Sequence, residues 1–472
     1  MTEQTMDQMK AMRENSISFR PTFEAHNAEA IALVSDLLTQ LGLSGNGPKT
    51  SSKHRLILSS VLAQSVRRNG DDNPILAVSK ETTHWAHYSA GKTAILQVFT
   101  ALEDYDFVSF VEGSGKFLIY EGADGKKHRI GVRSQYLVHD RLLELHGLEA
   151  AAWIDIDRPA ILVPVKETST ETYRRKSLGF SREKMGKSEV IKKFGRRYGQ
   201  AVAGANRISS VWQKHPLSLP VEGNCQPLYA ASATRIYHNG RMTASGRYYG
   251  AWSNVGSKQR LLCTIDGEPV VSVDLNASQP TLFSSLMGQQ MKVWRWSDLY
   301  EEALLDITLL GSSRSDTTDQ RRAKVKQVTV EMIGLGNPDK QRPAEDSKVK
   351  FRNQGEYFQY QYAMKKCVPA LELLDNEFLN GPNFISFHEA EIMQLTLDAL
   401  AAEGVPAYPV HDCLIVQKRY QNLAVTTYRQ TLKDYVLDYN RKEKVRPVDI
   451  TIPVSIEESG KVKKRLEGFY QS

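Results

Sequence analysis

Apolar residues along the chain follow two spacings, one helical and one confined to short β-type runs, which together predict a mixed α and β protein. Helical spacing covers about 54–69 and 90–104, and β-type runs follow at 107–111 and 117–120. The turn-forming composition of Glu112–Lys116 predicts that these two runs form a hairpin. Helices followed by such a hairpin predict a winged helix-turn-helix, a DNA-docking module, with a small α+β packing domain as the alternative.

The carboxyl-terminal half reads as one α/β region in which short apolar strands separate longer helical stretches. The predicted strands are 269–274, 406–417 and 448–455. The predicted helices are about 281–310, 318–334, 355–378, 387–403 and 420–437.

The length of the chain, 472 residues, exceeds that of one ordinary domain and predicts about two to four. We expect a helical segment (1–50), a winged-helix-like DNA-binding domain (51–150), a basic helical segment (151–218) and a larger domain (219–472).

The composition is typical of a soluble globular protein, with 41% hydrophobic and 24% charged residues. The 61 Lys and Arg residues exceed the 54 Asp and Glu residues by a net charge of +7, which permits a polyanionic partner without requiring one. The four cysteines form no CxxC pair, which argues against a structural zinc site or a disulfide framework. The sequence has no apolar run of about 18 residues and no leader, so it predicts no membrane partner and a cytoplasmic location.

Positive charge is concentrated in one segment, 171–215. From Arg174 to Lys214, twelve Lys and Arg residues face only Glu183 and Glu189. This excess predicts contact with a phosphate backbone, and the interleaved aromatic residues can pack on sugars or bases. A solvated helical face is the alternative. The residues that we assign to the primer–template backbone are Lys192, Lys193, Arg196 and Arg197.

Asp274 ends an apolar run, Val-Val-Ser-Val-Asp, and a helical stretch begins soon after it. A carboxylate at the end of a strand, with the backbone carbonyl of Leu275 beside it, provides the oxygen ligands that Mg²⁺ prefers. A lone aspartate at such a position is equally typical of a helix cap.

A second aspartate, Asp412, follows His411 between the apolar runs Val405–Val410 and Cys413–Val416, on a buried strand or at the tip of a hairpin. A charged aspartate inside such a run costs several kcal/mol if it has no partner. A metal ion shared with Asp274 would remove that cost, and a buried His–Asp hydrogen-bonded pair is the alternative. Two carboxylates that hold two divalent ions are the arrangement that nucleotidyl transfer requires.

Arg322 and Lys326 lie four residues apart in a helix-compatible stretch, and Arg321 and Lys324 add positive charge around them. A helix face of this kind can bind a triphosphate, with the arginine as a bidentate clamp and the lysine as a point charge. A solvated basic helix is the alternative, although the apolar residues between these cations indicate a helix anchored in the domain.

These segments, in this order, resemble motifs A, B and C of the superfamily that joins family A DNA polymerases to the single-subunit phage and mitochondrial RNA polymerases. Asp274 with Ser278 resembles motif A, Arg322-x₃-Lys326 resembles motif B, and His411-Asp412 resembles motif C.

Two further landmarks belong to the same resemblance, which covers about 220–420. Asn239–Thr243 and Ser245–Tyr249 are similar to the Thr-Gly-Arg segment that contacts the primer–template duplex, and Phe387–Met393 is similar to the helix before motif C.

The resemblance implies a right-hand α+β fold, with palm and fingers in 219–472, the fingers at about 288–350, and the basic segment as the thumb. It implies that Asp274 and Asp412 hold two Mg²⁺ ions, for which Mn²⁺ can substitute. Arg322 and Lys326 would bind the nucleoside triphosphate, and Lys326 would protonate the pyrophosphate.

The resemblance also assigns residues to the nucleic acid. His411 would touch the primer terminus, and Arg241 and Arg247 would follow the primer or template backbone.

The sequence departs from the family near the sugar and base. The stretch Val330–Gly336 has no aromatic residue where the family places one. Gln279 stands where DNA polymerases tend to have a sugar-blocking glutamate, so Ser278 and Gln279 are nucleotide-binding candidates and the bulky Gln279 favours deoxynucleotides. The chain upstream has no acidic cluster for a proofreading exonuclease.

We therefore expect a monomeric template-directed nucleotidyltransferase without proofreading, most simply a compact DNA polymerase of a mobile element or its host. A single-subunit RNA polymerase or primase of the same fold is one alternative. A non-catalytic DNA-binding initiator or regulator is the other.

Overall fold

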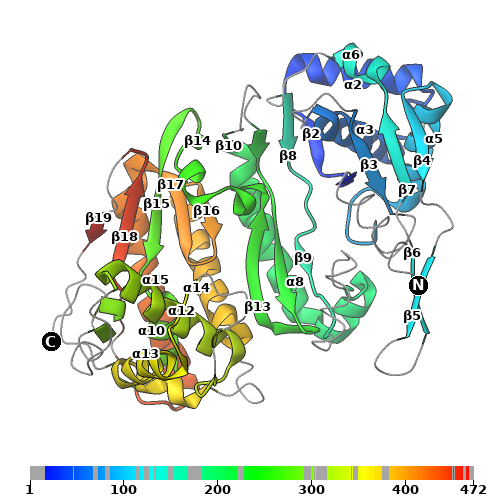
Figure 1. Cartoon of the computed structure of the whole chain (residues 1–472). Coiled ribbons are helices and arrows are strands. Elements are labelled where there is room, and N and C mark those ends of the chain that lie inside the picture. Colours follow the sequence, from blue (N-terminus) through cyan, green and yellow to red (C-terminus); the bar gives the residue numbers. More distant parts are fainter. Residues whose placement is uncertain are drawn as a thin grey trace. The chain divides into compact units, whose positions relative to one another are not determined.

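The computed structural model covers the whole chain and describes most of it (Figure 1). The described residues are 16–45, 47–66, 73–79, 85–112, 117–121, 127–131, 134–146, 152–166, 183–220, 228–291, 299–301, 303–304, 316–341, 343, 349–374, 382–448, 450, 452–460 and 464–466. Four of the predicted cations, Arg174, Arg175, Lys176 and Arg182, lie outside them.

The chain forms two compact units. The amino-terminal unit comprises Met1–Arg241 and Tyr249–Gly267, and the carboxyl-terminal unit comprises Met242–Tyr248 and Glu268–Ser472. Strand β13 (Arg241–Gly250) contributes to both.

The described part of the amino-terminal unit includes several helices and a sheet of order β1-β3-β7-β4. The helices are α2 (Ala28–Gln40), α3 (Pro48–Val66), α5 (Lys92–Asp104) and α6 (Asp140–His146), and the strands are β1 (Ser16–Ser18), β3 (Ile75–Val78), β4 (Val108–Glu112) and β7 (Ser134–Val138). Asn27 caps α2 by accepting a hydrogen bond from the Ala30 amide. Helices α3 and α5 pack together through buried apolar residues such as Leu58 and Phe99.

The predicted hairpin between 107–111 and 117–120 is wrong. Strand β4 pairs antiparallel with β7, and β5 (Phe117–Glu121) pairs antiparallel with β6 (Lys127–Gly131) as a separate hairpin (Figure 1). The sequence between β5 and β6 contains Asp124-Gly125, a stronger hairpin-turn pair than the one that we used.

A second sheet in the amino-terminal unit has the order β14-β10-β11-β8-β2. Its strands are β2 (Phe23–Ala25), β8 (Trp153–Asp155), β10 (Leu217–Leu219), β11 (Leu228–Ala230) and β14 (Thr264–Ile265). Strand β9 (Ile161–Leu162) pairs in parallel with β12 (Ala233–His238). The short helices η2 (Ala251–Asn254) and α9 (Ser257–Arg260) precede β14.

Helix α8 (Lys187–Lys214) holds the described part of the basic segment. Its helical path is broken at Gly195, where φ is 39° and ψ is −110°. Its carboxyl-terminal half is anchored by buried residues, among them Ile208 and Trp212, and the Trp212 ring meets the edge of Trp252 with centroids 5.1 Å apart.

The carboxyl-terminal unit is built on an antiparallel sheet of order β16-β17-β15-β18-β19. The strands are β15 (Glu268–Leu275), β16 (Ala407–Val410), β17 (Cys413–Gln417), β18 (Val454–Glu458) and β19 (Lys464–Leu466). Every residue of β16 and β17 is buried, so both faces of this hairpin are covered. Helix α15 (Gln421–Lys442) packs on β15 and β17, and also on α14 (Pro382–Ala402) and α10 (Ser278–Leu286).

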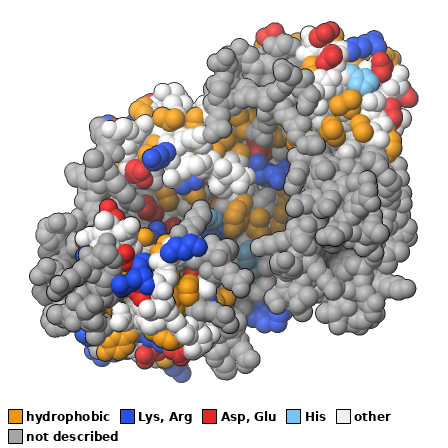
Figure 2. Space-filling model, viewed as in Figure 1, with side chains coloured by type: hydrophobic (Ala, Val, Ile, Leu, Met, Phe, Trp, Pro, Cys, Tyr) orange, Lys and Arg blue, Asp and Glu red, His pale blue; other side chains and the backbone are white. Residues whose placement is uncertain are grey.

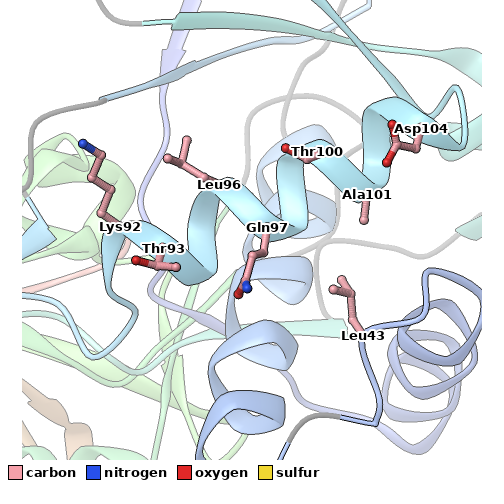
Figure 3. Close-up of a pocket in the computed structure, with 8 residues that line it drawn as sticks. All are labelled: Leu43, Lys92, Thr93, Leu96, Gln97, Thr100, Ala101 and Asp104. Carbon is pink, nitrogen blue, oxygen red and sulfur yellow. The ribbon is translucent and has the colours of Figure 1, made fainter.

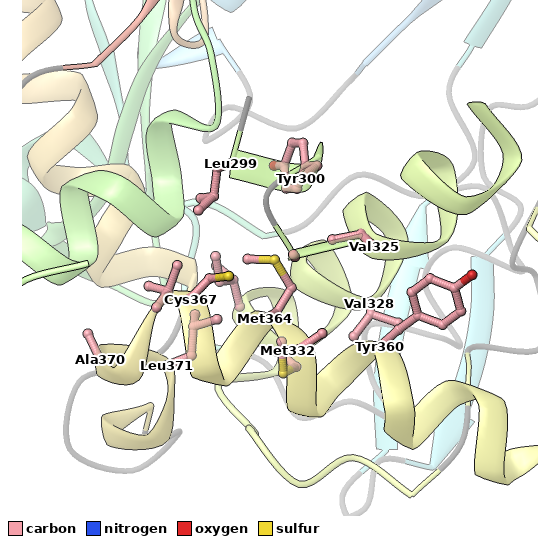
Figure 4. Packing of buried hydrophobic residues seen from close by; sticks show 14 of the residues in the cluster. Leu299, Tyr300, Val325, Val328, Met332, Tyr360, Met364, Cys367, Ala370 and Leu371 are labelled. Atoms are coloured by element: carbon pink, nitrogen blue, oxygen red, sulfur yellow. The ribbon is translucent and has the colours of Figure 1, made fainter. Parts of the chain in front are cut away.

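Two more helices of this unit, α12 (Thr318–Leu335) and α13 (Gln354–Cys367), share an apolar cluster with η3 (Pro369–Leu373) (Figure 4). Helix α12 begins with a capping box between Thr317 and Gln320 and ends at Gly336, whose φ of 59° suits a left-handed cap. The predicted helix over 318–334 is confirmed.

The described surface mixes both signs of charge. On the face shown in Figure 2, Lys and Arg side chains and Asp and Glu side chains are both scattered. Among the described residues, no helix is both long and apolar enough to span a membrane. The chain is a mixed α and β protein, as predicted.

Candidate active site

Of the two predicted metal-binding aspartates, Asp274 lies on β15 and Asp412 directly precedes the neighbouring strand β17. In the antiparallel register of β15 and β17, Asp274 pairs with Cys413, the residue directly after Asp412. Both aspartates are half-buried. Residues 138 positions apart along the chain are thus brought together by one strand pairing (412 − 274 = 138).

Asp412 lies at the tip of the β16–β17 hairpin, one of the two positions that the sequence allowed. Val410 pairs with Cys413, so His411 and Asp412 form a two-residue turn. His411 is exposed and has a φ of 57°, a left-handed conformation that few residues other than glycine adopt. Strained positions of this kind cluster at functional sites.

Ser278, at the start of α10, bridges two acidic side chains. Its hydroxyl oxygen lies 2.6 Å from Asp412 Oδ2 and 3.2 Å from Glu389 Oε1. A hydroxyl has one proton to donate, and the shorter distance assigns that proton to Asp412. Ser278 therefore fixes the orientation of the Asp412 carboxylate.

Glu389, on α14, is a site residue that the sequence analysis missed. Its side chain is 3% exposed, and it is paired with Arg247, whose Nε donates to Glu389 Oε2 at 2.8 Å. A glutamate beside the apolar residues of Phe387–Met393 was an available signal, because a buried carboxylate needs a partner. Arg247, which the sequence assigns to the nucleic-acid backbone, is in the structure the counter-ion of Glu389.

The charges around Asp412 change its acidity. Burial and the nearby Glu389 charge raise the pKa of Asp412 to about 6, while the Ser278 hydrogen bond and Arg247 oppose this rise. Tyr428 donates its hydroxyl proton to the Asp412 backbone carbonyl at 3.1 Å. Burial, and then the surrounding carboxylates, raise the pKa of Tyr428 well above its usual value, so this hydroxyl stays protonated.

Two further predicted residues, Leu275 and Gln279, lie close to Asp274 along the chain. Leu275, the last residue of β15, is buried and pairs with Val454 on β18. Gln279 is half-buried in the first turn of α10. Leu275 and Gln279 thus lie next to Asp274 and Ser278 along the chain, as the sequence requires.

The cations of α12 differ sharply in environment. Lys326 is exposed, and Arg322 is half-buried with its guanidinium carbon 5.4 Å from the centre of the Tyr300 ring. Lys324 is 5% exposed, and its Nζ lies 2.6 Å from Asp316 and 2.8 Å from Glu356. The expectation that Lys324 adds charge around the phosphate site is therefore wrong, because its charge is neutralised inside the fold.

Helix α12 packs against α10 and α14, the helices that carry Ser278 and Glu389. The structure thus brings the helix that carries Arg322 and Lys326 beside the helices that carry Ser278 and Glu389. The other predicted backbone contacts, Arg241 and the α8 residues Lys192, Lys193, Arg196 and Arg197, belong to the amino-terminal unit.

The donors at the aspartates suit a hard divalent cation, because all of them are carboxylate oxygens. Asp274, Asp412 and Glu389 bring three carboxylates to this part of the unit with Arg247 as a partner of Glu389, and the repulsion that raises the pKa of Asp412 would be relieved by a bound cation. Within the described ranges, no group of three or more His, Cys, Asp or Glu side chains is arranged as a preformed metal site.

A groove of about 600 Å³ lies elsewhere, along α5 in the amino-terminal unit (Figure 3). Its lining includes Lys92, Gln97, Asp104 and the apolar Leu43 and Leu96. It contains none of the predicted site residues.

No family model matches the chain, and no curated protein sequence matches it. Among the solved structures that it resembles is the POL domain of Pol1 from M. smegmatis in complex with DNA primer-template and dNTP. The similarity covers 91% of this chain and 71% of that chain, at 12% sequence identity and a TM-score of 0.33. A likeness this distant supports no conclusion about activity.

Proposed function

We propose that the chain is a template-directed nucleotidyltransferase that joins a primer 3′-hydroxyl to an incoming nucleoside triphosphate. The observation that carries the proposal is the pairing of Asp274 with Cys413, which brings Asp274 and Asp412 to the same end of the paired strands β15 and β17. Paired carboxylates placed in this way are the ligands that a two-metal transferase needs.

In this proposal Asp274, Asp412 and the Leu275 carbonyl hold the metal ions. Two bound Mg²⁺ ions, or Mn²⁺ in their place, would supply activation of the 3′-hydroxyl and neutralisation of the triphosphate charge. Ser278 keeps the Asp412 carboxylate oriented, and Glu389 in turn lies beside Ser278. The carboxylates must be ionised to act, so proton loss from Asp412 limits the reaction at low pH.

The cations of α12 bind the triphosphate in the proposed reaction. The Arg322 guanidinium is held against the Tyr300 ring, which reduces the freedom that it loses when it contacts a phosphate. The exposed ammonium of Lys326 binds the β- and γ-phosphates and gives a proton to the leaving pyrophosphate. Gln279, beside Ser278 on α10, excludes a 2′-hydroxyl and so favours deoxynucleotides.

We further propose a right-hand arrangement, with the β15–β17 sheet as palm, α12 in the fingers and the basic segment as thumb. His411 and Arg241 then contact the primer terminus and the nucleic-acid backbone. The amino-terminal DNA-docking module is supported by its order of elements, α3, β3, α5, β4 and β7, with sheet order β3-β7-β4 and the β5–β6 hairpin between β4 and β7.

Primer extension tests the proposal. We expect the chain, taken as a monomer, to extend a labelled primer on a DNA template with dNTPs and Mg²⁺, and to lose roughly 10³-fold or more of this rate on Asp274→Asn or Asp412→Asn. Asp438→Asn is a matched control, because Asp438 is an exposed aspartate of the same unit. Full activity in both aspartate variants would refute the two-metal assignment.

The same assay separates the related activities. NTPs replace dNTPs in one arm, and the primer is left out in another. Exclusive use of NTPs, or synthesis without a primer, would replace the DNA-polymerase assignment by an RNA polymerase or primase.

A further inference from the structure

The middle of helix α8 is unusual for a helix in a globular protein, because it contains no buried residue. From Ile191 to Ala203, thirteen consecutive residues, each described residue is exposed or half-buried and none is buried. A helix without a buried face gains little from packing within its own domain, so its position is favoured by a partner or by function. At 1.5 Å per residue this stretch is about 20 Å long, similar to roughly six phosphates along one DNA strand.

The charge of α8 identifies the kind of partner. Its sequence contains seven Lys and Arg residues, Lys187, Lys192, Lys193, Arg196, Arg197, Arg207 and Lys214, and Glu189 is its only acidic residue. The exposed face is therefore complementary to a polyanion. Phe194 and Tyr198, both half-buried, lie among the cations and provide apolar surface beside them.

The break at Gly195 divides this cationic stretch. In a straight helix, Lys192 would lie over Arg196 and Lys193 over Arg197, two like-charged pairs at a spacing that destabilises helices. The Gly195 conformation, φ 39° and ψ −110°, is accessible to glycine and strained for other residues. The break thus separates a first basic segment, with Lys192 and Lys193, from a second, with Arg196 and Arg197.

The first segment is anchored in its own unit by the buried Val190 and by a hydrogen bond from Lys193. Lys193 Nζ donates to the backbone carbonyl of Gly240 at 3.1 Å and lies 5.4 Å from the centre of the Phe194 ring. Lys193 therefore holds the helix in place, which differs from the backbone contact predicted for it. Lys192, Arg196 and Arg197, like Lys193, are exposed cations beside the break.

We propose that α8 binds the sugar–phosphate backbone of a nucleic-acid duplex with these two segments, and that Gly195 sets the angle between them. The phosphates of a duplex strand follow a curved path, so a straight row of cations meets few of them, whereas two segments at an angle follow the curve. The inference rests on the proposed function only for the identity of the polymer, a primer–template duplex. It concerns binding alone.

The test measures binding of the full chain to a labelled DNA duplex of arbitrary sequence, without nucleotide and with metal ions removed by chelator. Lys192→Ala and Arg196→Ala should each weaken binding and lower the salt slope by about one ion. Gly195→Ala should weaken binding by roughly tenfold, because the two segments lose their relative angle. Gly199→Ala is the matched control, because a Cβ at either glycine meets nothing within 4 Å and only Gly195 has a positive φ.

Equal affinities of Gly195→Ala and Gly199→Ala would overturn the role of the break. An unchanged salt dependence of binding in the Lys192→Ala, Arg196→Ala double variant would refute the proposal that α8 contacts the backbone phosphates. This double variant remains the test of that contact if Gly195→Ala fails to fold. Tighter binding to single-stranded than to duplex DNA would also contradict the proposal. If the protein binds duplex DNA as expected but does not extend a primer, the proposed function is refuted and the proposal that α8 binds the duplex stands.

Discussion

The guanidinium of Arg247 is paired with the carboxylate of Glu389, a residue 142 positions further along the chain. The Ser278 hydroxyl lies within hydrogen-bonding distance of both Glu389 and Asp412, so the ion pair is linked to Asp412 through Ser278. Strand β13, which carries Arg247, and helix α14, which carries Glu389, are far apart in sequence and together form one side of the candidate active site. A buried ion pair adds little net stability when intact but is costly to break on one side.

Arg247→Gln should therefore destabilise the fold by about 3 kcal/mol, because it leaves the Glu389 carboxylate buried without its counter-ion. Urea unfolding of the parent and of the variant measures this loss of unfolding free energy. Lys442→Gln, which breaks an exposed pair with Asp438, should cost less than about 1 kcal/mol. The double variant Arg247→Gln, Glu389→Gln should recover part of the loss, and a strictly additive double variant would show that the two side chains do not interact.

Asp412→Asn should make the metal-free protein more stable at pH 8. The folded state raises the pKa of Asp412 from 3.8 to about 6, so the protonated form is favoured by folding. This contribution is full below pH 4 and is lost as the pH rises through about 6, which costs the parent about 3 kcal/mol at most. The free energy of unfolding in urea, measured between pH 4 and pH 8 with chelator present, should become increasingly larger for the variant than for the parent as the pH rises. A difference in unfolding free energy that does not change with pH would contradict the shifted pKa.

Ser278→Ala should reduce primer extension by roughly tenfold and move the acidic limb of its pH profile to higher pH. The reason is that the Ser278 hydrogen bond lowers the pKa of Asp412, so its loss lets that pKa rise further. Ser284→Ala is a control from the same helix, since the Ser284 hydroxyl bonds only the Gln289 carbonyl among the contacts described for it. A Ser278→Ala profile that keeps its acidic limb in place would contradict the link to Asp412.

Lys326→Ala should impair activity and Lys324→Ala should impair stability, although the two lysines are only two residues apart. Lys326 is exposed, so its loss should raise the KM for the nucleotide and slow turnover while leaving thermal stability within about 0.5 kcal/mol. Lys324 is buried between Asp316 and Glu356, so its loss should destabilise the fold by about 3 kcal/mol. Thermal melts and steady-state kinetics on both variants test this, and a destabilised Lys326→Ala protein would contradict the assignment.

Some local elements of the carboxyl-terminal unit were predictable from the sequence. The strand that carries Asp274 and the helix that carries Arg322 follow from the spacing of apolar residues over a few positions. The sequence left Asp412 on a strand or at the tip of a hairpin, and the strand pairing decided for the hairpin. The helix predicted over 281–310 ends at Leu286, and the strand predicted over 448–455 begins only at Val454. The hairpin predicted from Glu112–Lys116 failed because several turn-compatible stretches compete there, and strand pairing, not turn composition alone, selects among them.

The sequence by itself determined which residue types could hold metal ions and phosphates and which short elements carry them, because periodicity and residue chemistry act locally. Only the tertiary structure decided that Asp274 faces Cys413, that Glu389 belongs beside Ser278, and that Lys324 is neutralised while Lys326 is exposed. Strand register and burial arise from contacts between distant parts of the chain, and the charge that each ionisable side chain presents depends on those contacts.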